Sequence, residues 1–133
     1  MSLAQQTRLY AAEAVLWGHG RDFSCTREVA DYLTDIMAAE WFVKRWPSLP
    51  TIEVFNLRTN KWAGCADRKS YAIYLRRRTE HVVLHELAHL LCSTDEHDMQ
   101  FVEILCHLVR NAMGFYAWAE FVASLEKEDY YGA

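Results

Sequence analysis

His85-Glu86-Leu87-Ala88-His89 matches the pattern H-E-x-x-H, and the interpretation of the whole chain depends on this stretch. Residues four apart lie one turn apart on the same face of an α-helix, so two imidazoles there can bind one metal ion. The azimuths of His85 and His89 differ by only about 40°. Glu86 lies about 60° from His89, where its carboxylate can reach a metal-bound water without binding the metal itself.

The residues around the motif predict a buried helix from Glu80 to Leu91, since apolar side chains flank both histidines. A buried pair of histidines needs a partner, and a metal ion is one such partner. If the metal is zinc, it lowers the pKa of its bound water toward about 7, and Glu86 can then take the proton as a general base. The motif therefore predicts a zinc-dependent hydrolase.

A catalytic zinc site takes three protein ligands and leaves one position open, so a third ligand is expected. His97 is the best candidate, because Ser93-Thr94-Asp95-Glu96 fits a capping box that would start a helix running to Met113. His97 would lie in the first turn of that helix, on the face that packs against the motif helix. Glu103 and His107 project elsewhere, whereas His81 lies on a face related to that of His85.

The segments before the motif contain two helices and then three strands. One helix is expected over residues 3–17 and a second over residues 26–46, with Thr26 as its cap and Pro47 after its end. The second helix has a predicted core face of Val29, Leu33, Ile36, Glu40 and Val43.

Alternating and β-branched residues indicate strands at Thr51–Leu57, Trp62–Ala66 and Tyr71–Leu75. These strands could form a small antiparallel three-stranded sheet. A last helix is expected over Tyr116–Glu128, after a stop at Gly114. The order of elements predicts a single α+β domain over residues 1–133, with the active-site helix after the sheet.

Composition places further limits on function. A net charge of −4 argues against a dedicated nucleic-acid binder. The local basic patch of Arg68, Lys69 and Arg76–Arg78 is expected to be a solvated turn and strand end, with an anionic contact as the alternative. Four isolated cysteines without a C-x-x-C pair, no signal-peptide pattern and no apolar run of transmembrane length predict a cytoplasmic protein without a membrane partner.

The stretch from Trp62 to Phe101 resembles the SprT-like zincins. The likeness rests on Ala63-Gly64-Cys65-Ala66, on Ile73-Tyr74-Leu75, on the H-E-x-x-H motif and on His97-Asp98-Met99-Gln100-Phe101. It is closer still to a group of small actinobacterial and phage metallohydrolases that keep only this compact core. Asp98 departs from the pattern, because the relatives usually have glycine there. The zinc ribbon and tails of the large DNA-repair relatives are also absent.

The resemblance implies a minimal zincin-like fold with zinc held by His85, His89 and His97, and with Glu86 as the base. It also implies that a peptide or protein substrate lies extended along a sheet edge, for which Trp62–Ala66 is the candidate. A Tyr or Arg that stabilises the oxyanion is implied too, with Tyr71, Tyr74 and Tyr116 as candidates. Two alternatives remain open: a non-catalytic zinc-binding regulatory or scaffold module, and a nucleic-acid-associated protease. The sequence does not decide the oligomeric state.

Overall fold

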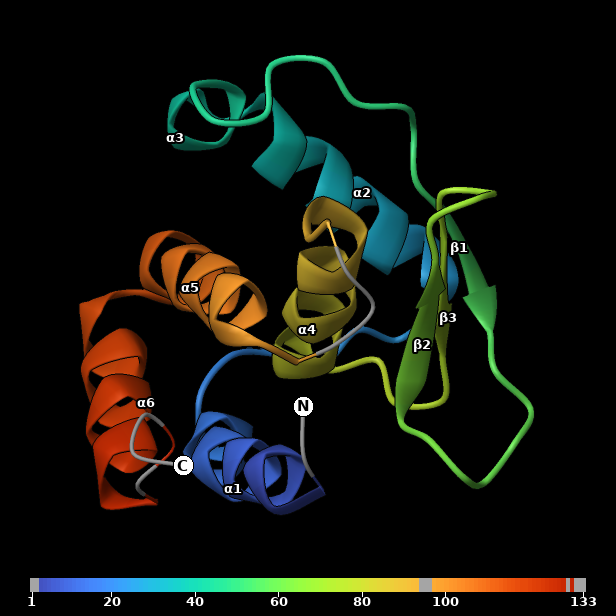
Figure 1. The fold of residues 1–133 in the computed structure, drawn as a ribbon. Coiled ribbons are helices and arrows are strands. Elements are labelled where there is room, and N and C mark those ends of the chain that lie inside the picture. The colour runs from blue at the N-terminus through green and yellow to red at the C-terminus, as the bar shows by residue number, and fades with distance from the viewer. Residues whose placement is uncertain (1–2, 94–96, 129, 131–133) are drawn as a thin grey trace.

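The computed structural model describes residues 3–93, 97–128 and 130 of the chain (Figure 1). The N-terminal part contains α1 (Leu3–Glu13), which continues as the 3-10 helix η1 (Ala14–Gly18). It is followed by α2 (Thr26–Ala38) and the short α3 (Glu40–Val43). The fold is α+β, with a three-stranded sheet packed on helices.

The second predicted helix is in fact two helices, because the chain turns at Ala39, which has extended backbone angles. Val29, Leu33 and Ile36 of α2 are buried as predicted, but Glu40 and Val43 are exposed. A straight helix would have carried Glu40 into the core, where an unpaired carboxylate is unfavourable. The turn instead puts Phe42 into the core and Glu40 into solvent. Thr26 is the first residue of α2, and Cys25 rather than Thr26 occupies the capping position.

The sheet contains β1 (Glu53–Asn56), β2 (Gly64–Asp67) and β3 (Ala72–Leu75), in the order β1-β3-β2. All three predicted strands exist, but the prediction of an antiparallel sheet was wrong. Only β2 and β3 form an antiparallel hairpin, and β1 pairs with β3 in parallel. The segment 57–63 carries the chain from one edge of the sheet to the other, so β1 and β2 do not pair with each other.

The central element is α4 (Glu80–Leu91), which has the predicted bounds and begins at a Thr79 cap whose Oγ1 accepts a hydrogen bond from the Val82 amide. Nearly all of its side chains are buried, because it packs between the sheet on one side and α5 (Met99–Leu108) on the other (Figure 1). A helix that is apolar around most of its circumference needs such cover on several sides.

The last elements are the π-helical turn η2 (Val109–Met113) and α6 (Phe115–Lys127). Gly114 separates them with a φ of 103°, a left-handed value that favours glycine, so the predicted stop is confirmed. α6 packs against α1, which brings the first and last helices together beside α4 and α5 (Figure 1). Among the described residues, no helix has both the length and the apolar character needed to cross a bilayer.

Candidate metal centre

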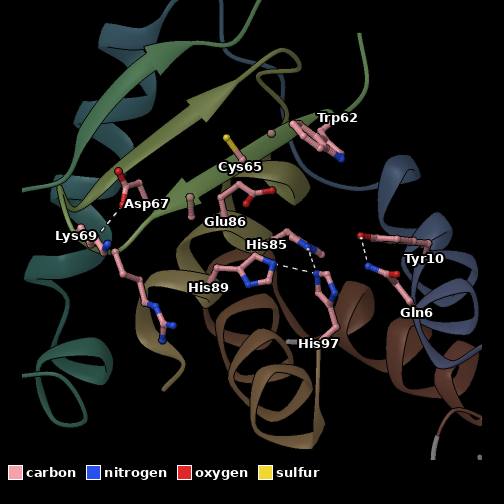
Figure 2. Close-up of a pocket in the computed structure, with 13 residues that line it drawn as sticks. Gln6, Tyr10, Trp62, Cys65, Asp67, Lys69, His85, Glu86, His89 and His97 are labelled. Carbon is pink, nitrogen blue, oxygen red and sulfur yellow. Dashed lines mark hydrogen bonds between the residues drawn. The ribbon is translucent and has the colours of Figure 1, made fainter. Parts of the chain in front are cut away.

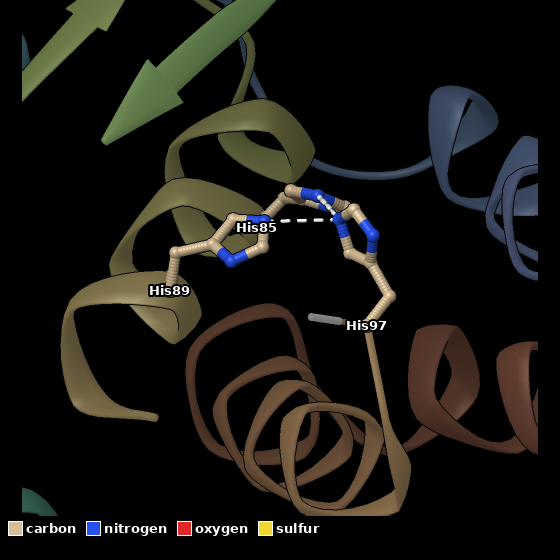
Figure 3. Close-up of side chains that lie close together, drawn as sticks. All are labelled: His85, His89 and His97. Carbon is tan, nitrogen blue, oxygen red and sulfur yellow. Dashed lines mark hydrogen bonds between the residues drawn. The ribbon is translucent and has the colours of Figure 1, made fainter. Parts of the chain in front are cut away.

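The three histidines predicted from the sequence lie together. His85 and His89 occupy successive turns of α4, with ring centroids 5.1 Å apart. The Nε2 atom of His97 lies 3.1 Å from Nε2 of His85 and 2.9 Å from Nε2 of His89 (Figure 3). Three imidazole nitrogens from two separate segments therefore converge on one point.

His97 reaches this point from a position other than the predicted one. α5 begins at Met99 and is capped by Asp98, whose carboxylate accepts from the Phe101 amide at 3.1 Å. His97 thus precedes the helix instead of lying in its first turn. Most of the proposed capping box, residues 94–96, lies outside the described residues. The departure from glycine at position 98 has a structural use, because aspartate is a good N-cap.

The backbone of His97 is held by the far end of the chain. Its carbonyl accepts a hydrogen bond of 2.5 Å from the hydroxyl of Tyr130, a buried side chain. The imidazole ring packs against Phe101, with centroids 4.9 Å apart. The same phenyl ring also packs against His85 and His89, at 4.9 and 4.5 Å. The Phe101 ring thus packs against all three histidine rings.

The donor set fits a metal ion. Nδ1 of His85 lies 2.6 Å from a carboxylate oxygen of Glu13, so that nitrogen carries a proton and leaves Nε2 with a bare lone pair in a neutral ring. His97 Nε2 faces two other nitrogens, and one N–H cannot point well at both. Three nitrogens around a tetrahedral zinc with Zn–N of about 2.0–2.1 Å would lie roughly 3.3 Å apart, close to the separations seen. His85, His89 and His97 could therefore hold a metal ion.

Glu13 of α1 was not predicted as part of the site, although it is only 2 % exposed. Its Oε1 also lies 2.8 Å from Nε2 of His81, so one oxygen binds two histidines of α4. A signal was available, because Glu13 shares the apolar face of the first helix with Leu9, Ala12 and Leu16, which are all fully buried. A lone acid on a core-facing stripe indicates a buried partner.

Ionisation in the metal-free protein follows from burial and charge. Burial alone would raise the pKa of Glu13, but the facing charge of His85 and the hydrogen bonds from His81 and His85 lower it to about 2. Burial would lower the pKa of His85, but Glu13 raises it to about 9. Burial and the nearby His85 lower the pKa of His89 to about 3 and that of His97 to about 4. His89 and His97 are therefore neutral at pH 7, whereas His85 carries a proton on both nitrogens.

Glu86 lies beside the histidines, between them and β2 (Figure 2). It is buried, and this burial raises its pKa to about 7, although the charge of His85 acts in the opposite direction. Glu86 lines a cavity of about 690 Å³ together with the three histidines, Tyr10 and residues of β2. A carboxyl group of this kind can exchange a proton near neutral pH.

One wall of the cavity is β2, which lies at the edge of the sheet as predicted for the segment Trp62–Ala66. At Gly64 this strand passes close to α4. An added Cβ there would lie 3.1 Å from Cγ of Glu86 and from Cγ1 of Val82. Glycine therefore lets the edge strand approach the carboxylate that faces the cavity.

The three tyrosines considered from the sequence do not line this cavity. Tyr74 stacks on Phe55, Tyr71 packs against the core, and Tyr116 is 81 % exposed on α6. Tyr10 lies there instead, with its ring 6.2 Å from His85 and 5.6 Å from His97 (Figure 2). Its hydroxyl accepts a hydrogen bond from the Gln6 side chain at 3.4 Å.

The competing candidates have other contacts. Glu103 pairs with Arg45 at 2.8 Å, and His107 packs between Trp41 and Trp46. The basic patch is also used within the fold. Arg76 donates to the Trp62 carbonyl, Arg78 donates to the Phe23 and Ser24 carbonyls, and Arg68 donates to the Cys92 carbonyl.

Comparison with known proteins yields no match, whether with family models, curated proteins or solved structures.

Proposed function

We propose that this chain is a zinc-dependent hydrolase that acts as a metallopeptidase, with zinc bound by His85, His89 and His97 and with Glu86 as general base. The observation that carries the proposal is the convergence of three Nε2 atoms beside a buried carboxylate in an open cavity. Structural zinc sites are closed by four protein ligands, whereas catalytic sites have three. The described residues bring three histidines to this point.

An all-imidazole donor set suits zinc, although other divalent transition metals also bind such ligands. When bound, zinc would act as a Lewis acid that polarises a carbonyl and lowers the pKa of a water molecule toward about 7. Glu86 would then receive the proton from the attacking water. Its raised pKa lets it return that proton to the departing amine, so that one carboxyl group acts first as base and then as acid.

The substrate that fits this cavity is an extended peptide. Among the described residues β2 pairs with β3 alone, so it is an edge strand, and its residues 64–67 line the cavity beside Glu86. A peptide that pairs with this edge would form main-chain hydrogen bonds and bring a scissile carbonyl past the histidines. The hydroxyl of Tyr10, on the opposite wall, would then donate to the oxygen that gains negative charge. We also propose a cytoplasmic location, because the four cysteines are isolated in the sequence and form no C-x-x-C pair.

The test compares the wild-type chain with Glu86→Gln. We expect both to bind one zinc per chain with similar affinity, and only the wild type to cleave a peptide substrate. If the variant cleaves a wild-type substrate at the normal rate, the assignment of Glu86 as general base is refuted.

A non-catalytic zinc module is the alternative, and it is distinguished by inhibitor binding. A peptide hydroxamate or phosphonate should bind the zinc-loaded enzyme tightly, because it occupies the open side of the metal. A zinc-loaded protein that binds neither inhibitor, and that merely unfolds when a chelator removes the metal, would be a structural module.

A further inference from the structure

Glu13 contacts Nδ1 of His85, the ring nitrogen other than the one that faces His97, and it comes from a helix that supplies none of the three histidines. We propose that Glu13 is a positioning residue: it fixes the tautomer and orientation of His85 and thereby sets the affinity of the centre for its metal. This inference rests on the proposed metal site. It adds a residue from α1 to a site whose ligands all lie between positions 85 and 97.

The first step of the argument is the tautomer of His85. A neutral imidazole carries one proton, and only the nitrogen without it can bind a metal. The Glu13 carboxylate accepts at 2.6 Å from Nδ1, which holds the proton on that atom. Nε2, which faces His97 at 3.1 Å, is therefore the nitrogen left free for a metal. Without the carboxylate the ring could carry its proton on either nitrogen and could also rotate.

The second step concerns what holds the carboxylate. His81 lies one turn before His85 on α4, and its Nε2 lies 2.8 Å from the same oxygen of Glu13. The His81 and Trp17 rings form a T-shaped pair, with centroids 5.1 Å apart. The Glu13 carboxylate is thus held by hydrogen bonds from two histidines of α4. Glu13, His81 and His85 also lie close enough together to hold a metal ion, and we assign them instead to hydrogen bonds, because one oxygen lies at hydrogen-bond distance from both nitrogens.

The third step is that packing alone gives no reason for an acid at this position. Glu13 is 2 % exposed, and its Oε2 has no hydrogen-bond partner among the described residues. A buried carboxylate that is only half satisfied destabilises a fold, so its presence calls for a role other than packing. A carboxylate behind a metal-binding imidazole has such a purpose, because it increases the basicity of the ligand and orders the ring.

Glu80 offers a matched control. It is also a buried glutamate, at the beginning of α4, but both of its oxygens are satisfied by protein groups. The Tyr32 hydroxyl donates to Oε2, and the Arg21 amide donates to Oε1 at 3.2 Å. None of these groups contacts His85, His89 or His97. Glu80 therefore has a structural role that can be removed without touching the metal ligands.

The experiment measures zinc affinity by competition with a chromophoric chelator for the wild type, Glu13→Gln and Glu80→Gln. We expect Glu13→Gln to weaken zinc binding about 10- to 100-fold, as loss of such a carboxylate typically does. Glu80→Gln should bind zinc like the wild type, even if its melting temperature falls. Equal affinity of Glu13→Gln and wild type would overturn the inference, and so would equal weakening by both variants. Failure of the wild type itself to bind zinc would instead refute the proposed function.

A second measurement needs no variant and covers the case in which Glu13→Gln does not fold. In the zinc-loaded wild type, long-range ¹H–¹⁵N correlation spectra of the histidine rings report which nitrogen carries the proton. We expect His85 to be protonated on Nδ1 and to bind zinc through Nε2. Zinc coordination through Nδ1 of His85 would rule out the hydrogen bond to Glu13 and overturn the inference.

Discussion

An added Cβ on Gly64 of β2 would lie 3.1 Å from Cγ of Glu86 on α4, a distance tighter than almost all real Cβ contacts. The same Cβ would meet the Tyr74 carbonyl oxygen of the neighbouring strand, also at 3.1 Å. The backbone cannot move away easily because β2 is paired with β3. The side chains of Glu86 and of Val82, whose Cγ1 also lies 3.1 Å from the added Cβ, therefore have to move.

Gly64→Ala should consequently displace the Glu86 carboxylate. We expect turnover of a peptide substrate to fall about 10- to 100-fold, since small misplacements of a catalytic group have effects of this size. Zinc affinity should stay unchanged, because the histidines are not touched. Gly18→Ala is the matched control, as nothing lies within 4 Å of its added Cβ. Unchanged turnover in Gly64→Ala would contradict the close approach of strand and carboxylate.

Zinc affinity should depend on pH in a predictable direction. At pH 7 the metal has to displace a proton from His85, whose pKa of about 9 in the metal-free protein is set chiefly by Glu13, against the opposing effect of burial. His89 and His97 are already neutral, with pKa values of about 3 and 4. The apparent affinity should thus rise about tenfold per pH unit up to about pH 9 and then level off.

Calorimetry in buffers of different ionisation enthalpy measures the number of protons released. About one proton should leave per zinc bound at pH 7. A release close to zero would mean that His85 is already neutral in the metal-free protein, whereas a release above one proton would include ionisation of a metal-bound water, whose pKa zinc brings toward about 7.

Tyr10→Phe tests the phenol on the wall opposite β2. Removal of a hydrogen-bond donor from a developing oxyanion typically lowers kcat by 100-fold or more, so a loss of about 100-fold is expected. KM and zinc affinity should change little. Tyr116→Phe serves as the control because that ring lies outside the cavity on α6. A fall in kcat that is equally large in both variants would remove Tyr10 from the mechanism.

Phe101→Ala tests whether the contact of Phe101 with the three histidine rings supports zinc binding. Truncation of a fully buried phenylalanine costs about 3–5 kcal/mol of folding free energy, measured by denaturant unfolding of the metal-free protein. Zinc affinity should fall in addition, because the rings lose the surface that orders them. Phe121→Ala removes an equally buried ring from α6 and should destabilise the fold similarly without that effect. Equal zinc affinities in the two variants would show that Phe101 only fills space.

Local periodicity was enough to predict the parts of the site that lie close together in sequence. α4 has its predicted bounds, and the spacing of His85 and His89 puts both on one face. His97 was identified as a partner from the apolar face that follows it, and the structure places it beside them. Its exact location was missed, because the cap of α5 is Asp98 and not Ser93.

Contacts between distant segments could not be derived in the same way. The parallel pairing of β1 with β3 depends on how segment 57–63 crosses the sheet, and strand patterns do not encode that path. The bond between Glu13 and His85 joins residues 72 positions apart. Only the position of an acid on the apolar face of α1 indicated that it needed a partner, and nothing local indicated which one.

The bond from Tyr130 to the carbonyl of His97 has a consequence for the order of events during synthesis. The N-terminus of a nascent chain leaves the ribosome first, so Glu13 and all three histidines emerge from the exit tunnel before Tyr130 does. A nascent chain therefore acquires its metal ligands before it acquires the contact that holds one of them in place. The hydrogen bond that holds the His97 backbone can form only after residue 130 has emerged, which is later than the synthesis of every residue that would touch the metal.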